Sequence, residues 1–224
     1  MKPVSFRLHG WESWAPHDNA EKAIAIPTLL RRRITPIGQK ALNCAWELPE
    51  AANARIILSS RHGEFSRTLS LLEAIISKSD LSPADFTLSV HHALIGLLSI
   101  VQKNHKGHTA IASGSESFCF GLLEAAACLH ENPNESVVLI HFDDLLQDSF
   151  AEFNNPNEQP IALALALTGV GGNEEFQIDI EPNSSSVPSA LHAQDFLKFV
   201  SSDARECLSV GENQKWRWTR NAVA

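Results

Sequence analysis

The sequence lacks an excess of basic residues. Of its 224 residues, 18 are lysine or arginine and 26 are aspartate or glutamate, which gives a formal net charge of -8. Because a nucleic-acid-binding protein needs a basic face to neutralise phosphates, this balance argues against that class. The one basic cluster, Arg31-Arg32-Arg33, is typical of a solvated surface, with contact to an acidic protein or a phosphate as the alternative.

The sequence also lacks an apolar run long enough to cross a membrane, and residues 1–6 do not resemble the apolar core of a signal peptide. It contains no C-x-x-C pair, and most of its cysteines stand in apolar helical patterns where a reduced thiol packs as a small hydrophobe. We therefore expect a cytoplasmic protein in a reducing compartment. The four cysteines are Cys44, Cys119, Cys128 and Cys207.

What the sequence does contain is an alternation of apolar strands and helices. Continuous apolar runs at residues 55–60, 136–142 and 161–168 are typical of buried strands. Residues 176–180 alternate apolar and polar side chains, as expected for an antiparallel edge strand joined to the preceding run by a hairpin at 169–173. The pattern predicts a layered α/β fold with a mostly parallel sheet and an antiparallel edge.

The length favours one domain over residues 1–224, with a core at 1–182. A polar, flexible connection at 181–188 precedes a predicted amphipathic helix at about 189–207 and a tail that ends in Trp216-Arg217-Trp218.

Three local predictions concern the first hundred residues. The chain forms a strand at residues 4–8 and then turns sharply at 10–16. Two helical pieces at 24–45 are interrupted at Pro36. A helix at 91–100, apolar on nearly every side, is buried.

Residues 107–130 read as a short strand, a turn of small residues and an amphipathic helix. Such a junction often holds a nucleophile beside a helix N-terminus. Ser113 or Ser115 would suit a serine hydrolase, but the full G-x-S-x-G pattern is absent. Cys119 is the nearest thiol, and its position inside the helix favours core packing over nucleophilic attack.

Two further groups of residues have both a structural and a functional interpretation. One alternative is a metal cluster of His91, His92, His105 and His108, but ordinary hydrogen-bonded histidines suit the spacing better. Asp143-Asp144 at a strand end suits a loop carboxylate pair better than cation binding or acid–base work. We expect neither a metal nor a cofactor.

Several motifs together resemble one family. They are Gly10-Trp11 with Trp14-Ala15-Pro16, Ser60-Arg61-His62-Gly63-Glu64, Ser89-Val90-His91, Ser117-Phe118 with Gly121-Leu122-Leu123-Glu124-Ala125, and Trp216-Arg217-Trp218. In this combination the chain resembles the short, stand-alone β-ketoacyl-synthase-like proteins that are chain-length-factor-like and belong to aryl polyene and related type II fatty-acid or polyketide systems.

The resemblance implies the thiolase-like layered α/β fold of the N-terminal half of a ketosynthase, with a mixed sheet and an antiparallel edge. It also implies that the family's nucleophilic cysteine falls within Ser113, Gly114, Ser115 and Glu116, none of which is cysteine. The two histidines that serve decarboxylation in a ketosynthase come from a second half, which these 224 residues do not contain. Claisen condensation needs that thiolate, so the resemblance implies a non-catalytic subunit.

The same resemblance implies a heterodimer with an active β-ketoacyl synthase, which elongates polyene or fatty acyl chains on an acyl carrier protein. The strand expected to pair with the partner consists of His108, Thr109, Ala110, Ile111 and Ala112. The candidates for the lining of the acyl tunnel are Phe86, Leu94, Leu97 and Phe118. The alternatives are an independent acyltransferase or serine hydrolase acting on acyl thioesters, and a carrier-protein-binding module without a ketosynthase partner.

Overall fold

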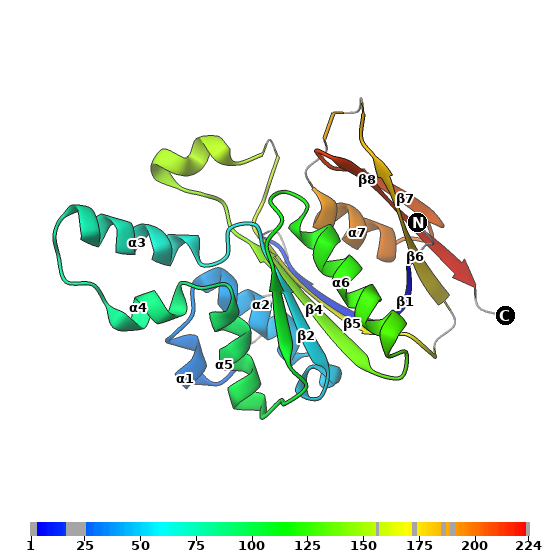
Figure 1. Ribbon diagram of the computed structural model, residues 1–224, viewed down its shortest axis with the longest axis horizontal. Helices are drawn as coiled ribbons and strands as arrows, with labels where there is room; N and C mark the ends of the chain where they lie inside the picture. Colours follow the sequence, from blue (N-terminus) through cyan, green and yellow to red (C-terminus); the bar gives the residue numbers. More distant parts are fainter. Residues whose placement is uncertain are drawn as a thin grey trace.

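An eight-stranded sheet forms the centre of the computed structural model, which describes residues 4–16, 26–155, 157–171, 174–184, 187–188 and 191–222 (Figure 1). The strand order is β3-β2-β4-β5-β1-β6-β8-β7. The strands are β1 (Val4–Trp14), β2 (Arg55–Ser59), β3 (His108–Ile111), β4 (Ser136–Asp143), β5 (Ile161–Thr168), β6 (Glu174–Pro182), β7 (Glu206–Val210) and β8 (Gln214–Ala222).

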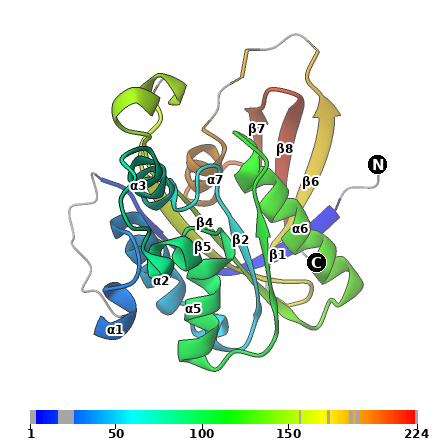
Figure 2. The ribbon, with the colours of Figure 1, turned by 60° about the vertical axis from the view of Figure 1, so that its left-hand side comes forward.

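Helices cover both faces of this sheet. They are α1 (Thr28–Arg31), α2 (Pro36–Trp46), α3 (Phe65–Ile76), α4 (Pro83–Leu88), α5 (His92–Gln102), α6 (Ser117–Glu131) and α7 (His192–Val200), with 3-10 turns η1 (Pro49–Ala52) and η2 (Asp148–Phe153). The core residues of α1, α2 and α5 belong to one hydrophobic cluster and those of α6 and α7 to another. Figure 2 shows the two groups of helices on opposite sides of the strands. None of the helices in the described ranges has the length and apolar character needed to cross a membrane.

Strand β5 shows how the sequence divides the two faces. Its alternating sequence IALALALT places Ala162, Ala164 and Ala166 in the cluster with α2, and the leucines between them in the cluster with α6. Small side chains let α2 approach the sheet closely, while leucines fill the wider space on the other side. The buried run predicted at 161–168 is therefore confirmed.

The sheet is mixed, as predicted, but it is not mostly parallel. Strand β2 runs parallel to β3 and β4, and every other neighbouring pair is antiparallel. The predicted hairpin between β5 and β6 is wrong, because β1 lies between them and pairs with both. For the same reason residues 176–180 lie inside the sheet, between β1 and β8, rather than at its edge.

The N-terminal turn predicted at residues 10–16 is also wrong in its first part. Strand β1 continues to Trp14, and only a register shift between Leu8 and Gly10 interrupts its pairing with β5. The predicted break at Pro36 is confirmed, since Pro36 is the first residue of α2 and the Thr35 hydroxyl caps that helix by accepting a hydrogen bond from Gly38 N.

The C-terminal segment differs most from the prediction. Helix α7 ends at Val200, and Cys207, predicted to be helical, lies on β7; residue 189 is outside the described residues. The predicted tail is strand β8, in which Trp216 and Trp218 are fully buried. Trp216 and Trp218 stand on either side of Arg217, and this alternation of period two is the signal of a half-buried strand. The polar stretch continues β6 to Pro182, and its predicted flexibility stays a prediction.

Helix α5 is buried on one side only. Leu94, Ile95 and Leu98 reach the core, whereas Ile100 is 74% exposed, so the prediction of a fully buried helix is wrong. Helices α3 and α4, next to it, project from the body of the protein (Figure 1).

Candidate functional site

The predicted strand, turn and helix of residues 107–130 are present as β3, a tight turn and α6. The hydroxyl of Ser117 closes the turn, because it accepts a hydrogen bond from Ser113 N at 2.9 Å and donates one to Gly114 O at 2.7 Å. Gly114 has a φ of 60°, in the left-handed region where glycine carries no steric cost. We call residues 112–116 the elbow.

Glycine also sets the distance between α6 and the sheet. A Cβ atom at Gly121 would lie 2.7 Å from the Cβ of Ser59 on β2, closer than real side chains come. The helix that follows the elbow can therefore lie directly on β2 only because residue 121 has no side chain.

The four positions predicted to include the family's cysteine differ in exposure. Ser113 and Gly114 are exposed, Ser115 is half-buried and Glu116 is 4% exposed. In the described part of the chain, no histidine hydrogen-bonds to Ser113 or Ser115. A serine without a base is a weak nucleophile, so the geometry gives the hydrolase interpretation no support.

Glu116 connects the elbow to the far end of the chain. Its Oε2 accepts a hydrogen bond from Trp216 Nε1 at 3.0 Å, and its Oε1 accepts one from Asn213 N at 3.1 Å. The turn between β7 and β8 thereby lies against the elbow. A cavity of about 240 Å³ remains between them, lined by Ser113, Gly114, Ser115, Glu116, Phe120, Glu212, Asn213 and Gln214.

Cys119, the other candidate nucleophile, lies in the first turn of α6 and is 1% exposed. Burial raises the pKa of its thiol well above the usual value, and the nearby carboxylates of Glu116 and Asp195 raise it further. Because the thiolate is the reactive form, the site disfavours nucleophilic attack. This agrees with the prediction that Cys119 packs in the core.

The histidines considered for a metal site do not form one. Residues 4–16, 26–155 and the later described segments contain no group of three or more His, Cys, Asp or Glu able to hold a metal ion. His92 and His108 do meet, with ring centroids 5.2 Å apart, while His91 packs against Gly63 and His105 is exposed. Burial and the neighbouring His92 lower the pKa of His108.

Asp143 has a structural role that the sequence did not reveal. Its carboxylate accepts hydrogen bonds from Arg61 N at 2.8 Å, His62 N at 2.9 Å and the Ser60 hydroxyl at 2.8 Å. The carboxylate thus holds the loop after β2 in place, and its oxygens are already occupied. Asp144 beside it is exposed and accepts a hydrogen bond from Leu145 N.

The other end of the Ser60–Glu64 motif is also tied into the fold. Glu64 is 5% exposed and accepts a hydrogen bond from the Thr35 hydroxyl at 2.9 Å. Burial raises the pKa of Glu64. The motif therefore joins the loop after β2 to the start of α2, which explains its sequence without catalysis.

Two buried histidines near α6 were not singled out from the sequence. His141 Nδ1 lies 3.0 Å from the Ser59 hydroxyl, and burial lowers the pKa of His141. His192 Nδ1 lies 2.7 Å from the Ser209 hydroxyl, which donates to Asp195 Oδ2 at 2.7 Å. Burial likewise lowers the pKa of His192. Single histidines near the end of a strand or at the start of a helix carry no periodic signal, so only the fold could bring these pairs together.

The four tunnel candidates occupy different places. Leu94 and Leu97 pack with the α2 side of the sheet, whereas Phe118 is buried on the α6 side and Phe86 is 68% exposed on α4. None of them lines either of the two cavities described in this section, so a common tunnel remains a prediction that involves a partner. The partner-strand residues are His108 to Ile111, half-buried on β3, and exposed Ala112.

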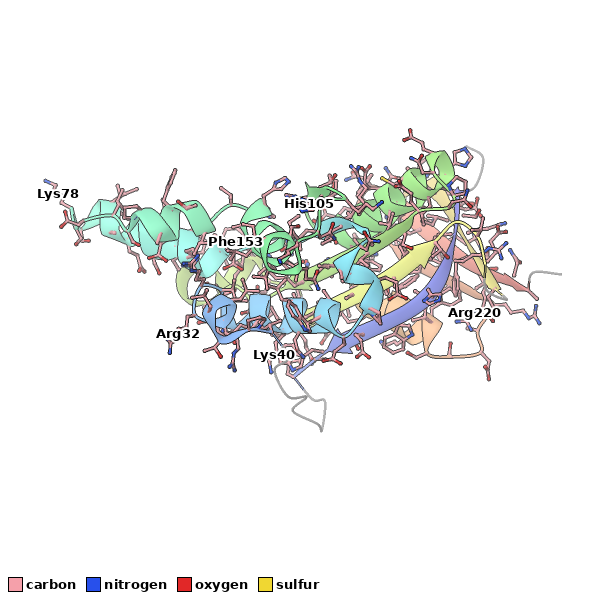
Figure 3. The ribbon with its side chains drawn as sticks, turned by 90° about the horizontal axis from the view of Figure 1, so that it is seen from below. Arg32, Lys40, Lys78, His105, Phe153 and Arg220 are labelled. Atoms are coloured by element: carbon pink, nitrogen blue, oxygen red, sulfur yellow. The ribbon has the colours of Figure 1, made fainter. Side chains whose placement is uncertain are left out.

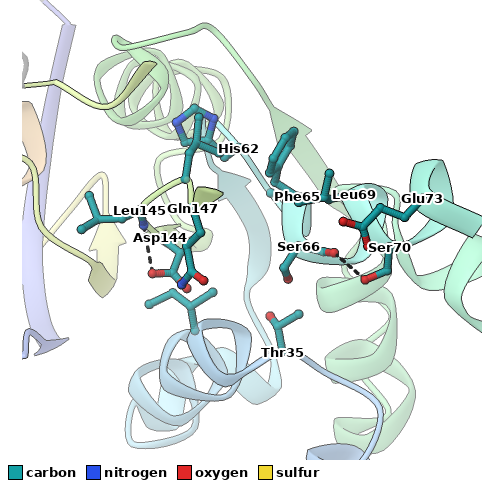
Figure 4. A pocket seen from close by; sticks show the side chains of 13 residues that line it. Thr35, His62, Phe65, Ser66, Leu69, Ser70, Glu73, Asp144, Leu145 and Gln147 are labelled. Atoms are coloured by element: carbon teal, nitrogen blue, oxygen red, sulfur yellow. Dashed lines mark hydrogen bonds between the residues drawn. The ribbon is translucent and has the colours of Figure 1, made fainter. Parts of the chain in front are cut away.

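A second cavity, of about 250 Å³, lies between α3, the start of α2 and the segment after β4 (Figure 4). One part of its wall is apolar and the rest carries hydroxyl, amide, imidazole and carboxylate groups. Glu73 and Asp144 lie on this wall and disfavour an anionic ligand. The lining residues are Thr35, Ile37, His62, Gly63, Phe65, Ser66, Leu69, Ser70, Glu73, Asp144, Leu145, Leu146 and Gln147.

Comparisons with known proteins support the fold seen here. Residues 9–219 match the family described as the N-terminal domain of β-ketoacyl synthases. No curated protein sequence matches the chain.

Three solved structures are similar to this one. A chain of the complex between the ketosynthase ApeO and its chain length factor ApeC from Xenorhabdus doucetiae has a TM-score of 0.84 and 22% identity, and the match covers 96% of this chain and 99% of that chain. The ishigamide ketosynthase/chain length factor has a TM-score of 0.58 and 10% identity, with 80% and 57% covered. A β-ketoacyl synthase from Burkholderia phymatum STM815 has a TM-score of 0.57 and 11% identity, with 75% and 53% covered.

Proposed function

This chain belongs to the β-ketoacyl synthase family through its N-terminal domain, and from that premise we propose that it is a non-catalytic, chain-length-factor-like partner of an active β-ketoacyl synthase. Together the two chains elongate polyene or fatty acyl groups carried on an acyl carrier protein in an aryl polyene pathway.

The elbow carries this proposal. The expected strand, tight turn and helix are all present. The turn consists of Ser113, Gly114, Ser115 and Glu116 and contains no thiol. The nearest thiol, Cys119, is buried and its pKa is raised. Condensation needs a reactive thiolate to hold the acyl chain, and this site does not supply one.

The position of β3 supports a partner chain. Strand β3 is the last strand of the sheet on its side, and among the described residues it pairs with β2 alone. Ile56 N donates to Gly107 O and Ser60 N donates to Ile111 O. The backbone N–H and C=O groups of the odd-numbered residues of β3 therefore point toward β2. By alternation, the backbone N–H and C=O of Ala110 point outward, where a strand of another chain can bind them.

The extent of the similarity supports the same role. The match to a chain of the Xenorhabdus doucetiae complex covers nearly all of both chains, whereas the matches to the other two proteins cover only 57% and 53% of those chains. At 22% identity the likeness concerns the fold, and the role is our inference.

Co-expression with the β-ketoacyl synthase from the same gene neighbourhood tests the proposal. We expect the two chains to co-elute as one complex with condensing activity. A stable monomer that leaves the activity of the synthase unchanged would refute it. Incubation of the isolated chain with an acyl thioester should give no covalent adduct by intact mass, whereas an adduct would favour an independent acyltransferase or hydrolase.

A matched pair of variants tests the edge strand. Ala110→Pro removes the outward N–H of residue 110. It keeps the hydrogen bonds between β3 and β2, since proline is tolerated on edge strands. Ala110→Ser keeps that N–H and adds one atom. We expect the proline variant to lose the complex and the serine variant to retain it.

A further inference from the structure

The turn between α5 and β3 is built around one buried amide. Asn104 is 9% exposed, whereas the residues on either side of it are exposed. Figure 3 shows His105, the next residue, between Lys78 and Arg220, which lie toward opposite ends of the molecule. Burial of a polar side chain within an exposed turn needs a reason, because it is unfavourable unless hydrogen bonds replace those to water.

Both polar atoms of this amide have partners. Asn104 Nδ2 donates to Ala51 O at 2.9 Å and to Ala54 O at 2.8 Å. Its Oδ1 accepts a hydrogen bond from Lys106 N at 2.8 Å. The backbone N–H of Asn104 donates to Ser99 O of α5 at 2.9 Å. One residue therefore joins the end of α5, the turn before β2 and the turn before β3.

An amide is the side chain that suits these three partners. Two of them are carbonyl groups, which need N–H donors, and the third is an N–H group, which needs an acceptor. Aspartate has the same shape but places a carboxylate against the carbonyls of Ala51 and Ala54, and alanine offers no polar group. The surroundings of Asn104 thus select asparagine by their chemistry.

These bonds act at the point where the edge strand begins. Gly107 O accepts a hydrogen bond from Ile56 N at the start of the pair formed by β2 and β3. Asn104 bonds to the chain just before each of these residues, at Ala54 and at Lys106. Strand β3 has only four residues, and among the described residues it pairs with β2 alone. Such a short edge strand depends on its neighbours for its position.

The backbone of the turn also needs an anchor. Lys103 has a φ of 54° and Gly107 a φ of 82°, so residues in the left-handed region stand on both sides of Asn104. This conformation is unfavourable for lysine and persists only where the surrounding structure enforces it. The hydrogen bonds of Asn104 lie between the two residues and hold the turn in this shape.

We propose that Asn104 is a positioning residue for the strand addition proposed at β3, because it holds the edge strand in place before the synthase binds. This inference rests on the proposed function. A partner strand that binds a preformed edge avoids the entropy lost when loose residues are ordered. Asn104 itself is buried and acts through β3.

Two destabilising variants test this inference. Asn104→Ala removes the three side-chain hydrogen bonds next to β3. Leu165→Ala destabilises the protein from β5, with β2 and β4 between it and β3. Asn53→Ala, at an exposed asparagine in the turn before β2, is the local control. Urea unfolding measures stability, titration calorimetry measures affinity for the synthase, and hydrogen exchange reports on the amides of Thr109 and Ile111, which point toward β2.

We expect Asn104→Ala to bind the synthase at least about tenfold more weakly and to exchange the amides of Thr109 and Ile111 faster than the wild type. Under conditions where they are folded, Leu165→Ala and Asn53→Ala should bind like the wild type. If Asn104→Ala does not fold, Asn104→Ser, which keeps one donor and one acceptor, replaces it with the same expectation.

A folded Asn104 variant that binds as tightly as the wild type overturns the inference and leaves the proposed function intact. An equal loss of affinity in Leu165→Ala shows a general effect of stability and also overturns it. A wild-type chain that does not bind the synthase at all refutes the proposed function itself.

Discussion

Trp216 Nε1 donates a hydrogen bond to Glu116 Oε2 across 3.0 Å, although the two residues are 100 positions apart in the chain. Both side chains are buried, and a hydrogen bond between an indole and a carboxylate in such a place is costly to break. The conformation of the elbow is therefore maintained by β8, which carries Trp216.

Removal of this carboxylate should destabilise the protein. Glu116→Ala leaves Trp216 Nε1 and Asn213 N without their acceptor, and we expect the free energy of unfolding to fall by about 2 kcal/mol. Urea denaturation measures the change. The same loss should be absent for Glu152→Ala, because Glu152 is exposed.

Gly211 offers an independent check of the same contact. A Cβ atom at residue 211 would overlap the Glu116 carboxylate, so Gly211→Ala should push Glu116 away from Trp216 and destabilise the wild type by a similar amount, about 2 kcal/mol. In the Glu116→Ala background the substitution should cost far less. A double-mutant cycle with additive effects would contradict this account.

The thiols should differ in reactivity. Cys119 is buried with a raised pKa, so iodoacetamide should modify it only when the protein unfolds. Cys128 and Cys207 are partly exposed, and each should react faster in the native state even though burial also raises the pKa of each. Peptide mapping by mass spectrometry identifies the order, and rapid native labelling of Cys119 would reopen its candidacy as a nucleophile.

Stability should fall as the solution becomes acidic. Burial holds the pKa of His141 below its ordinary value of 6.5, so the unfolded chain binds a proton there that the folded chain does not. The free energy of unfolding should therefore decrease as the pH drops below about 6.5. His141→Gln should lose less stability than the wild type between about pH 7.5 and about pH 5.5, whereas His105→Gln, at an exposed site, should follow the wild type.

The face of β5 toward α2 should not tolerate added side-chain volume, and the face toward α6 should not tolerate its removal. Ala164→Leu forces three extra carbons between β5 and α2 and should cost about 1–3 kcal/mol. Leu165→Ala on the other face leaves a cavity and should cost about 2–5 kcal/mol. Ala52→Leu, at an exposed alanine, is the control and should be nearly neutral when measured by thermal unfolding.

The elements with strong local patterns could be predicted from the sequence. The runs that form β2, β4 and β5 were recognised because an uninterrupted apolar run suits a strand buried on both faces. The elbow was also recognised, since small residues between a short strand and an amphipathic helix leave few other conformations. The helix boundary at Pro36 followed from proline chemistry alone.

Strand pairing was the part that could not be predicted. Sequence order suggests that β5 and β6 are neighbours, but a strand from the other end of the chain separates them, and nothing local reports this. The alternation of Trp216 and Trp218 was a readable strand signal that the prediction missed. The buried contacts of Glu116, Asp143 and His141 depend on that long-range pairing, so their structural roles could not be assigned before the fold was known.

The central position of β1 has a consequence for how the chain is made. Trp14 pairs with Ala162 and Val4 pairs with Ile178, so β1 has no neighbouring strand until β5 and β6, which follow it far along the chain, have been synthesised. Until then its apolar side chains are open to chaperones or to wrong partners. Completion of the sheet is thus a late event of biosynthesis.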